Sequence, residues 1–153
     1  MQTRKMTVAD TPGVADLIRA AFAAQSVPTD PPPSARLETA ATVAATLAKG
    51  GGAVTEESGI LTGSVLWEEK AGGLYIGRLS VHPGHRRKGI ARALVAAAEA
   101  EARLRALPRL WLFTRLPLLD NRRLFASCGF VETGKHAHPG YSAPTFVDME
   151  KRL

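Results

Sequence analysis

Three kinds of feature are scarce in this chain of 153 residues, and each scarcity excludes a class of protein. Cys128 is the only cysteine, so an intramolecular disulfide is excluded and nothing indicates an oxidising compartment. No apolar run approaches the roughly 18 residues of a membrane span, and no apolar stretch of signal-peptide length follows Met1. We therefore expect a soluble, cytoplasmic protein with no membrane partner.

Aromatic residues make up only 6% of the sequence, and 14 acidic residues face 20 lysines and arginines, which gives a net charge of +6. The arginines gather in residues 86–92, 103–109 and 115–123. Such a basic chain attracts polyanions. Because aromatics are few and no recognition motif is found, nucleic acid is the weaker interpretation, and a smaller polyanionic ligand is preferred.

The length and the 45% of hydrophobic residues are those of one domain, residues 1–153, with one sizeable core. The pattern of apolar residues and breakers predicts an α/β fold. Strands are expected over residues 2–7, 53–56, 60–69, 74–81, 109–114, 130–133 and 145–151. Helices are expected after a cap at Asp10, from a cap at Ser34 to Lys49, from Gly89 to about Leu107, and from Asn121 to Cys128, with a proline-rich loop over Ser26–Pro33.

These elements predict a mixed, mostly antiparallel central sheet of six to seven strands flanked by helices. The strands 53–56, 60–69 and 74–81 form an antiparallel meander in the simplest interpretation. A crossover through the helix that starts at Gly89 makes the strands 74–81 and 109–114 parallel. The residues expected on the core face of that helix are Ile90, Leu94, Ala97 and Leu104.

The segment Val81–Leu94 leads from a strand through glycine and cationic residues into an alanine-rich helix. Backbone N–H groups at a helix start have no intrahelical acceptor and attract anions. Gly89 and Ala91 allow a ligand to approach the main chain, and Arg86, Arg87 and Lys88 add charge. The segment therefore predicts a cradle for a pyrophosphate.

The run Arg86-x-x-Gly89-x-Ala91 resembles the acyl-CoA loop of the GNAT superfamily of N-acyltransferases. Leu79-Ser-Val-His-Pro83 upstream resembles the strand that leads into that loop. Downstream, Asn121-x-x-x-Phe125-x-x-x-Gly129-Phe130 resembles the family's closing helix and next strand, in the same order and spacing. The resemblance implies a GNAT fold, with a V-shaped splay between the strands 74–81 and 109–114.

The resemblance also implies acetyl transfer from acetyl-CoA, as co-substrate, to a primary amine by direct attack. The pantetheine arm enters the V in this family and bonds to the backbone of the first strand. The residues expected to bind CoA are Leu79, Ser80, Val81, Arg86, Arg87, Lys88, Gly89, Ile90, Ala91, Arg92, Asn121 and Phe125. Asn121 matches an asparagine that contacts the pantetheine arm in this family; a helix cap is the alternative role, and the two roles are compatible.

Phe125 departs from the family pattern, because it stands where a tyrosine often protonates the leaving thiolate. Phenylalanine has no proton to donate, so that role does not transfer to this chain. Tyr75 and Ser80, on the strand 74–81, are the candidate catalytic residues. Glu68 and Glu69 lie at the far end of that strand and are expected on the surface. Asp30 or Glu38 is a further candidate for the general base if the proline-rich loop folds over the acceptor side of the site.

The remaining reactive side chains are given structural roles. Cys128 is expected to be inert and buried. The spacing of His82, His85, His136 and His138 shows no convergent ligand set, so no metal is predicted. Tyr141 is available to line the acceptor pocket.

The acceptor is expected to be a small-molecule or peptide amine, and self-association as a homodimer stays open. The first alternative is a CoA-binding sensor or partner without turnover. A basic nucleic-acid-binding module is the weaker one.

Overall fold

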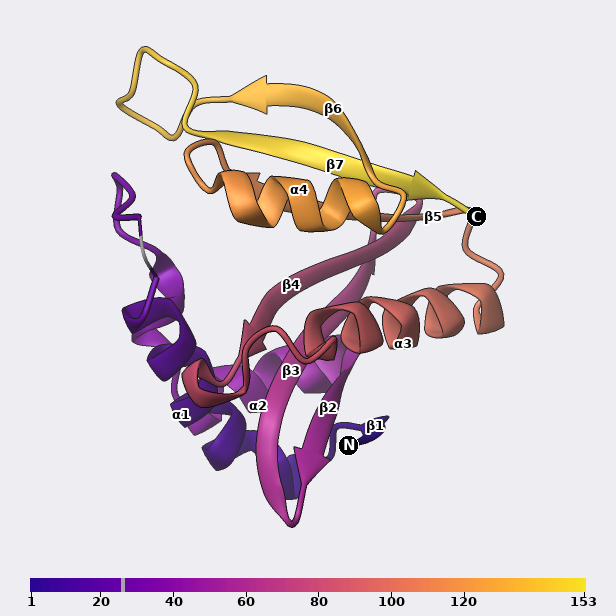
Figure 1. Ribbon diagram of the computed structural model, residues 1–153. Helices are drawn as coiled ribbons and strands as arrows, with labels where there is room; N and C mark the ends of the chain where they lie inside the picture. Colours follow the sequence, from indigo (N-terminus) through magenta and orange to yellow (C-terminus); the bar gives the residue numbers. More distant parts are fainter. Residues whose placement is uncertain (26) are drawn as a thin grey trace.

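The computed structural model describes residues 1–25 and 27–153, which build one seven-stranded sheet with helices on both faces (Figure 1). Ser26, the first residue of the predicted proline-rich loop, lies outside the described residues. The strands are β1 (Gln2–Lys5), β2 (Gly51–Glu57), β3 (Ile60–Lys70), β4 (Gly73–Val81), β5 (Arg109–Arg115), β6 (Val131–His136) and β7 (Phe146–Arg152). The α-helices are α1 (Thr11–Ala23), α2 (Ala40–Lys49), α3 (Ile90–Leu104) and α4 (Leu119–Ser127), and short 3-10 helices cover Val8–Asp10, Ser34–Leu37 and Pro83–His85.

The strands follow the order β1-β2-β3-β4-β5-β7-β6, and β4 with β5 forms the parallel pair. The meander β2-β3-β4 is antiparallel, as the sequence predicts. The parallel pairing of β4 with β5 covers only two residue pairs, Leu74 with Leu110 and Tyr75 with Trp111. Beyond them the two strands diverge (Figure 1), so the predicted mixed sheet with a V-shaped splay is confirmed.

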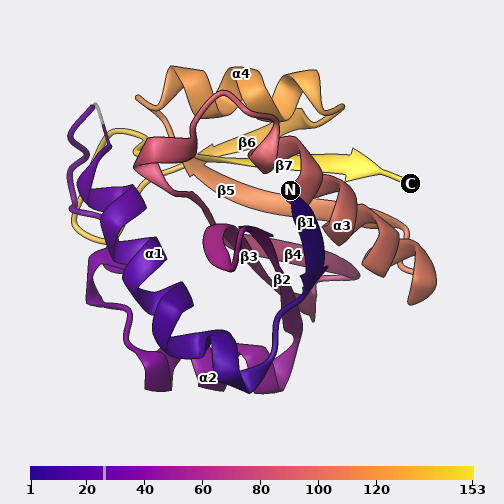
Figure 2. The ribbon, with the colours of Figure 1, turned by 60° about the horizontal axis from the view of Figure 1, so that its bottom comes forward.

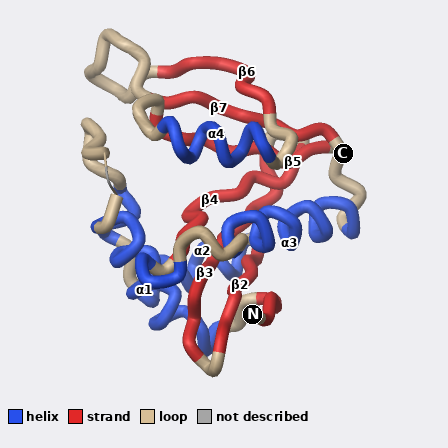
Figure 3. The backbone as a smooth tube through the Cα atoms, viewed as in Figure 1, coloured by secondary structure: helices blue, strands red, loops and turns tan. Residues whose placement is uncertain are grey.

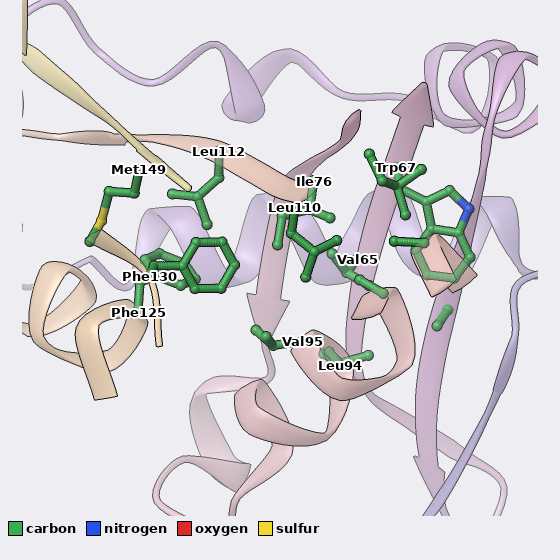
Figure 4. Packing of buried hydrophobic residues seen from close by; sticks show 14 of the residues in the cluster. Val65, Trp67, Ile76, Leu94, Val95, Leu110, Leu112, Phe125, Phe130 and Met149 are labelled. Carbon is green, nitrogen blue, oxygen red and sulfur yellow. The ribbon is translucent and has the colours of Figure 1, made fainter. Parts of the chain in front are cut away.

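Two apolar cores lie on opposite faces of the sheet (Figure 2). The larger one packs α3 and α4 against the sheet and joins Leu94 of α3 with Phe125 of α4 and Leu112 of β5. In Figure 4, Phe125 and Phe130 lie beside Leu112 and Met149, while Leu94 and Val95 lie below Val65. The smaller core packs α1 and α2 against β2 and β3. Each face therefore has its own helical layer.

The start of α2 and the capping bond at the start of α1 differ from the prediction. The helix expected to begin at Ser34 is a short 3-10 turn followed by α2, whose cap is Thr39, with a side-chain oxygen that accepts from the Thr42 N–H. Asp10 precedes α1, but its carboxylate accepts from the Thr7 N–H at 2.8 Å and makes no cap bond to α1. Local turn chemistry decides both cases, because a threonine or aspartate can bond to several nearby amides.

Leu104 was expected in the core and is 76% exposed. The buried stripe of α3 runs through Leu94, Ala98 and Ala102, so Leu104, in the last turn, falls beyond its edge. Glu101 lies within that stripe at 8% exposure, held by Arg105 and Lys5. The hydrogen bond from Arg105 lowers the pKa of Glu101, which therefore stays ionised. Among the described residues, no helix has the length and apolar character to cross a bilayer.

Candidate active site

A β-bulge in β4 shapes the open end of the V. Ser64 and Leu66 are two positions apart on β3, whereas their β4 partners, Ser80 and Gly77, are three positions apart. Arg78, between these partners, takes a left-handed conformation with φ of 54°. An extra residue reverses the alternation of a strand. Leu79 and Val81 therefore pack on the same core as Leu74 and Ile76.

The edge of β4 that faces β5 has no strand partner after Tyr75. Unpaired N–H and C=O groups at such an edge can bond an extended ligand as they would bond another strand. The segment predicted to bind the pantetheine arm, Leu79–Val81, lies within this free edge. The fold thus leaves room for an extended chain between β4 and β5.

The basic cradle begins where β4 ends. Gly89 has a φ of 77° and is the N-cap of α3. The first helical bond runs from the Ala93 N–H to the Gly89 carbonyl at 3.0 Å, so the three amides before Ala93 have no helical acceptor. A Cβ added at Gly89 would meet no atom within 4 Å. A bulky anion could therefore approach the main chain at this point.

A groove of about 1020 Å³ opens over this cradle and runs between α3 and α4. Its lining includes most of the residues predicted to bind CoA: Leu79, Ser80, Val81, Arg86, Arg87, Gly89, Ile90, Ala91, Arg92, Asn121 and Phe125. Lys88 is not part of that lining and is exposed. Arg123, which sequence reasoning missed, lines the groove and pairs with Asp120 at 3.5 Å.

Three predicted site residues have contacts that bear on their roles. Ser80 is 1% exposed, and its hydroxyl donates to the Arg78 carbonyl at 2.9 Å. Asn121 lies in the first turn of α4, whose N-cap is Leu118, so the helix-cap alternative is wrong. Phe125 is 7% exposed and packs on Phe130, with 5.8 Å between ring centroids.

A second cavity, of about 420 Å³, lies on the other side of the V. Its lining includes the aromatic residues Phe22, Tyr75, Phe113, Phe125 and Phe146, so we call it the aromatic cavity. The groove and the cavity share six lining residues, which are Phe22, Gln25, Leu79, Leu118, Asn121 and Phe125. The two spaces therefore meet where β4 and β5 diverge.

Tyr75 lies against Trp111 and Phe113, with 4.8 and 5.7 Å between ring centroids. A Cβ at Gly77 would lie 3.4 Å from the Tyr75 hydroxyl, so the phenol extends along β4 toward the open end of the V. Burial raises the pKa of Tyr75 above its usual value. The phenol therefore stays protonated at neutral pH and is a donor rather than a base.

The proline-rich loop borders the cavity at Pro33. Tyr141, between β6 and β7, donates to the Asp30 carboxylate at 2.6 Å, and Arg115 of β5 donates to the Pro31 and Pro32 carbonyls. Figure 3 shows this loop and the β6–β7 connection side by side. Neither Asp30 nor Tyr141 is among the residues that line the cavity, so Tyr141 holds the loop rather than lining the pocket as expected.

The histidines make local contacts. His82 Nδ1 accepts from the Gly84 N–H at 3.0 Å, and His136 contacts Asp148 at 2.9 Å. Within the described part of the chain, no group of three His, Cys, Asp or Glu side chains could hold a metal ion. His138 lines the cavity, and burial, with a smaller effect of Arg115, lowers its pKa below 6.5. Its imidazole is therefore neutral at pH 7.

Sequence reasoning did not identify His138 or Arg115 as site residues. Arg115 lies at the end of β5, and burial lowers the pKa of its guanidinium. The aromatic neighbours Phe113 and Phe146 were also missed. A strand of alternating side chains places Phe113 and Arg115 on one face, and this was the one signal in the sequence that could have joined them.

Family comparison agrees with this geometry. A family model described as the acetyltransferase (GNAT) family matches residues 19–130. The match covers most of the chain, which therefore belongs to this family of acetyltransferases. No curated protein sequence matches it.

Solved structures share the fold at low sequence identity. A ribosomal-protein-alanine N-acetyltransferase from Brucella melitensis superposes with a TM-score of 0.77 at 20% identity, covering 100% of both chains. The putative acetyltransferase yncA from Salmonella typhimurium, solved with acetyl-CoA, has a TM-score of 0.76 at 21% identity over 100% of this chain and 94% of its own. The paia N-acetyltransferase from Thermoplasma acidophilum, solved with coenzyme A, has a TM-score of 0.79 at 15% identity over 99% and 98%.

Proposed function

We propose that this chain transfers the acetyl group of acetyl-CoA to a primary amine by direct attack. The observation that carries the proposal is the meeting of a basic groove and an aromatic cavity at the V between β4 and β5. The groove would hold the nucleotide and pantetheine of CoA, and the cavity would hold the acceptor. Six shared lining residues are where the two substrates would meet.

The residues of the groove fit a pyrophosphate. The free amides of Ile90–Arg92, the open space at Gly89 and the charges of Arg86 and Arg87 all face the same groove. The free edge of β4 over Leu79–Val81 suits the amides of an extended arm. Ser80 would contribute through its backbone, because its hydroxyl is already bonded to Arg78.

The chemistry needs little from the protein beyond position. Bound acetyl-CoA supplies a thioester, whose carbonyl carbon the amine attacks and whose sulfur leaves as a thiol. The chain must hold a neutral amine near the V and deliver a proton there. Tyr75, protonated and directed toward the open end of the V, is the group that we assign to donate this proton.

Two features of the cavity favour the neutral amine. Cationic neighbours lower the pKa of an ammonium group, and Arg78 and Arg115 both line the cavity. His138 is neutral at pH 7 and can accept the amine proton directly or through water. Its Nδ1 contacts the Thr145 hydroxyl, which fixes the orientation of the ring.

A CoA-binding protein without turnover is the second candidate. Phe125 has no proton to donate, so the usual proton donor of the family is missing here. The hydroxyl of Ser80, the other predicted catalytic residue, already donates to the Arg78 carbonyl. This candidate differs from the first in one property only, the release of free thiol.

The deciding experiment is a panel of primary amines incubated with acetyl-CoA, with free thiol release measured against a protein-free control. Calorimetry with acetyl-CoA and with a duplex oligonucleotide accompanies it. Acetyl-CoA binding with amine-dependent thiol release is the expected result. Binding without release from any amine favours the second candidate, and oligonucleotide binding in place of acetyl-CoA binding contradicts both.

A further inference from the structure

The charged groups that line the aromatic cavity are of one sign. Arg78 and Arg115 belong to the lining, and among the described residues no aspartate or glutamate does. An acceptor that carries several positive charges, such as a polyamine, would face two guanidinium groups with no lining carboxylate to bind it. The charges of the lining therefore disfavour the binding of polycations and favour the binding of anionic groups.

Arg115 lacks an acidic partner. Within the described part of the chain, the arginines with no carboxylate oxygen within 4.0 Å are Arg36, Arg86, Arg87, Arg92 and Arg115. Three of these line the CoA groove, where an anion is expected, and Arg36 is exposed. Arg115 lies in the cavity instead, half-buried, with only the carbonyls of Pro31 and Pro32 as acceptors.

A half-buried guanidinium without a counter-ion is costly, because burial removes water that carbonyl oxygens replace only in part. An anionic group of a ligand would restore the lost interaction through charge-assisted hydrogen bonds. Arg78 offers a second cationic group. Its Nη2 donates to the Ser34 hydroxyl at 2.9 Å and lies 3.7 Å from Glu38 Oε1. Asp30 lies near Arg115 but is exposed and is bonded to Tyr141.

The rest of the wall suits a flat apolar group. The rings of Tyr75, Phe113 and Phe146 follow one another with centroids 5.7 and 5.3 Å apart. A volume of about 420 Å³ lies within the roughly 300–1,000 Å³ of small-molecule sites. The proline-rich loop, held by Tyr141 and Arg115, borders the cavity at Pro33, and a volume of this size fits a small molecule better than a long peptide.

We propose that the acceptor is a small primary amine that also carries an anionic group, such as a carboxylate, bound by Arg115 and Arg78, and an apolar body that packs on the aromatic wall. Aromatic and large apolar amino acids have this chemistry. The inference rests on the proposed function for the reaction, but the binding that it describes is measurable without turnover.

The test compares acids with their esters. L-phenylalanine, L-tryptophan and L-methionine, their methyl esters, spermidine and a short peptide with an amidated C-terminus are titrated into the CoA-loaded protein by calorimetry. At least one free acid should bind about 10- to 100-fold more tightly than its ester, because a charge-assisted pair is lost in the ester. Spermidine and the peptide should bind more weakly than that acid.

Variants separate recognition from structure. Arg115→Gln should remove the difference between acid and ester, while a purely structural role in holding the loop would weaken both equally. Arg115→Lys should restore part of the difference. Arg152→Gln, an exposed arginine on β7 outside the cavity, is the matched control and should change neither affinity.

Equal binding of acids and esters, tighter binding of spermidine or the peptide, or no binding of any acid would each overturn the proposal. The proposed function fails separately, through the absence of thiol release with every amine. An enzyme that acetylates esters as readily as acids would keep its function and refute the inference.

Discussion

Tyr141 donates a hydrogen bond of 2.6 Å to Asp30, and this bond joins the β6–β7 connection to a loop 111 positions earlier in the chain. The bond holds the pKa of the Tyr141 phenol above its usual value. Together with the contacts of Arg115 to Pro31 and Pro32, it fixes the wall of the acceptor cavity. The geometry of the cavity therefore depends on two segments that no local pattern connects.

Removal of this bond should loosen the acceptor site and leave the CoA site intact. Tyr141→Phe should raise the KM for the acceptor about 2- to 10-fold, since the loop loses one hydrogen bond. The KM for acetyl-CoA should not change, and Asp30→Asn should have a similar but smaller effect. Steady-state kinetics with each substrate varied in turn are the measurement. A change in the KM for acetyl-CoA alone would show that the bond supports the CoA site and not the acceptor site.

The cradle can be tested with two glycines that share one backbone conformation. Gly89 and Gly59 have φ values of 77° and 79°, and a Cβ at either position meets no atom within 4 Å. Each change to alanine should cost about 1 kcal/mol of stability, because alanine disfavours positive φ. Only Gly89→Ala should also weaken CoA binding, by about 10-fold or more. Urea denaturation and calorimetry measure the two effects.

Gly59, in the β2–β3 turn, is thus the matched control for strain. Equal CoA affinity in the two variants would contradict the cradle. Alanine is preferred to valine here, because a β-branched residue at positive φ adds strain that obscures the effect on the ligand.

Two basic residues of the same loop should differ in their effect on CoA. Arg86 lines the groove and Lys88 does not, although both are exposed. Arg86→Ala should raise the Kd for CoA about 5- to 10-fold at low salt, and Lys88→Ala about 2-fold or less. Both effects should shrink at 0.5 M salt, where the Debye length is roughly 4 Å, because exposed charges are screened. Calorimetry at two salt concentrations tests this, and a larger effect of Lys88 would refute the assigned lining.

Much of the fold was predictable because each signal was local. The Ser58-Gly59 turn, the apolar run of β5 and the Gly89 start of α3 are short patterns, and each predicted its element correctly, although Gly51, Gly52 and Gly73, expected at breaks, lie in strands. The bulge at Arg78 was not predictable, since it depends on the register of β4 against β3. Leu104 was wrongly placed in the core because the helical period gives the angles between side chains and does not say which of them the sheet covers.

The two halves of the candidate site also differ in how far the sequence could predict them. The CoA groove is formed mainly by two continuous segments, residues 79–92 and 117–125, and each of them carries a short sequence motif. The acceptor cavity joins the proline-rich loop, β4, β5 and the β6–β7 connection through contacts such as Arg115 with Pro31. Its members are distant in sequence, and Arg115 and His138 carry no motif of their own.

The N-terminal ion cluster makes a prediction for stability against pH. Arg4 bonds both Asp10 and Glu56, and the hydrogen bond from Arg4 lowers the pKa of Asp10 from 3.8 to about 2. Because the folded pKa lies below the unfolded one, this stabilisation is complete above about pH 5 and is lost as the pH falls toward 2. Asp10→Asn should cost about 1 to 2 kcal/mol at pH 7, less than the full shift implies because the pair is partly exposed.

At pH 2.5, still above the folded pKa of about 2, roughly a third of this stabilisation should remain, so the difference in urea midpoint between the Asp10→Asn variant and the parent should shrink to about a third of its value at pH 7. Urea denaturation at the two pH values measures the difference. Asp16→Asn, a change at an exposed carboxylate near the start of α1, controls for net charge. A pH-independent loss in the Asp10 variant would mean that the carboxylate acts through packing alone.

The last prediction concerns the proton that the leaving group takes. The chain has two tyrosines, and their hydroxyls should affect different constants. Tyr75→Phe should lower kcat about 10- to 100-fold, which is modest for general acid catalysis because a thiolate leaves without full protonation. It should leave the Kd for CoA unchanged. Tyr141→Phe, the matched control, should leave kcat unchanged and alter the KM for the acceptor.

Phe125 allows the same proton to be supplied from the other side of the V, because its ring lines both the groove and the cavity. Phe125→Tyr placed in the Tyr75→Phe variant should recover at least part of the lost kcat, since it puts a phenol where other family members carry one. Phe125→Leu in the same background should not, although it also keeps the position apolar. Thermal unfolding of each variant separates a loss of rate from a loss of fold, since Phe125 belongs to the core. If Tyr75→Phe keeps full kcat, the proton comes from water and Tyr75 has only a packing role.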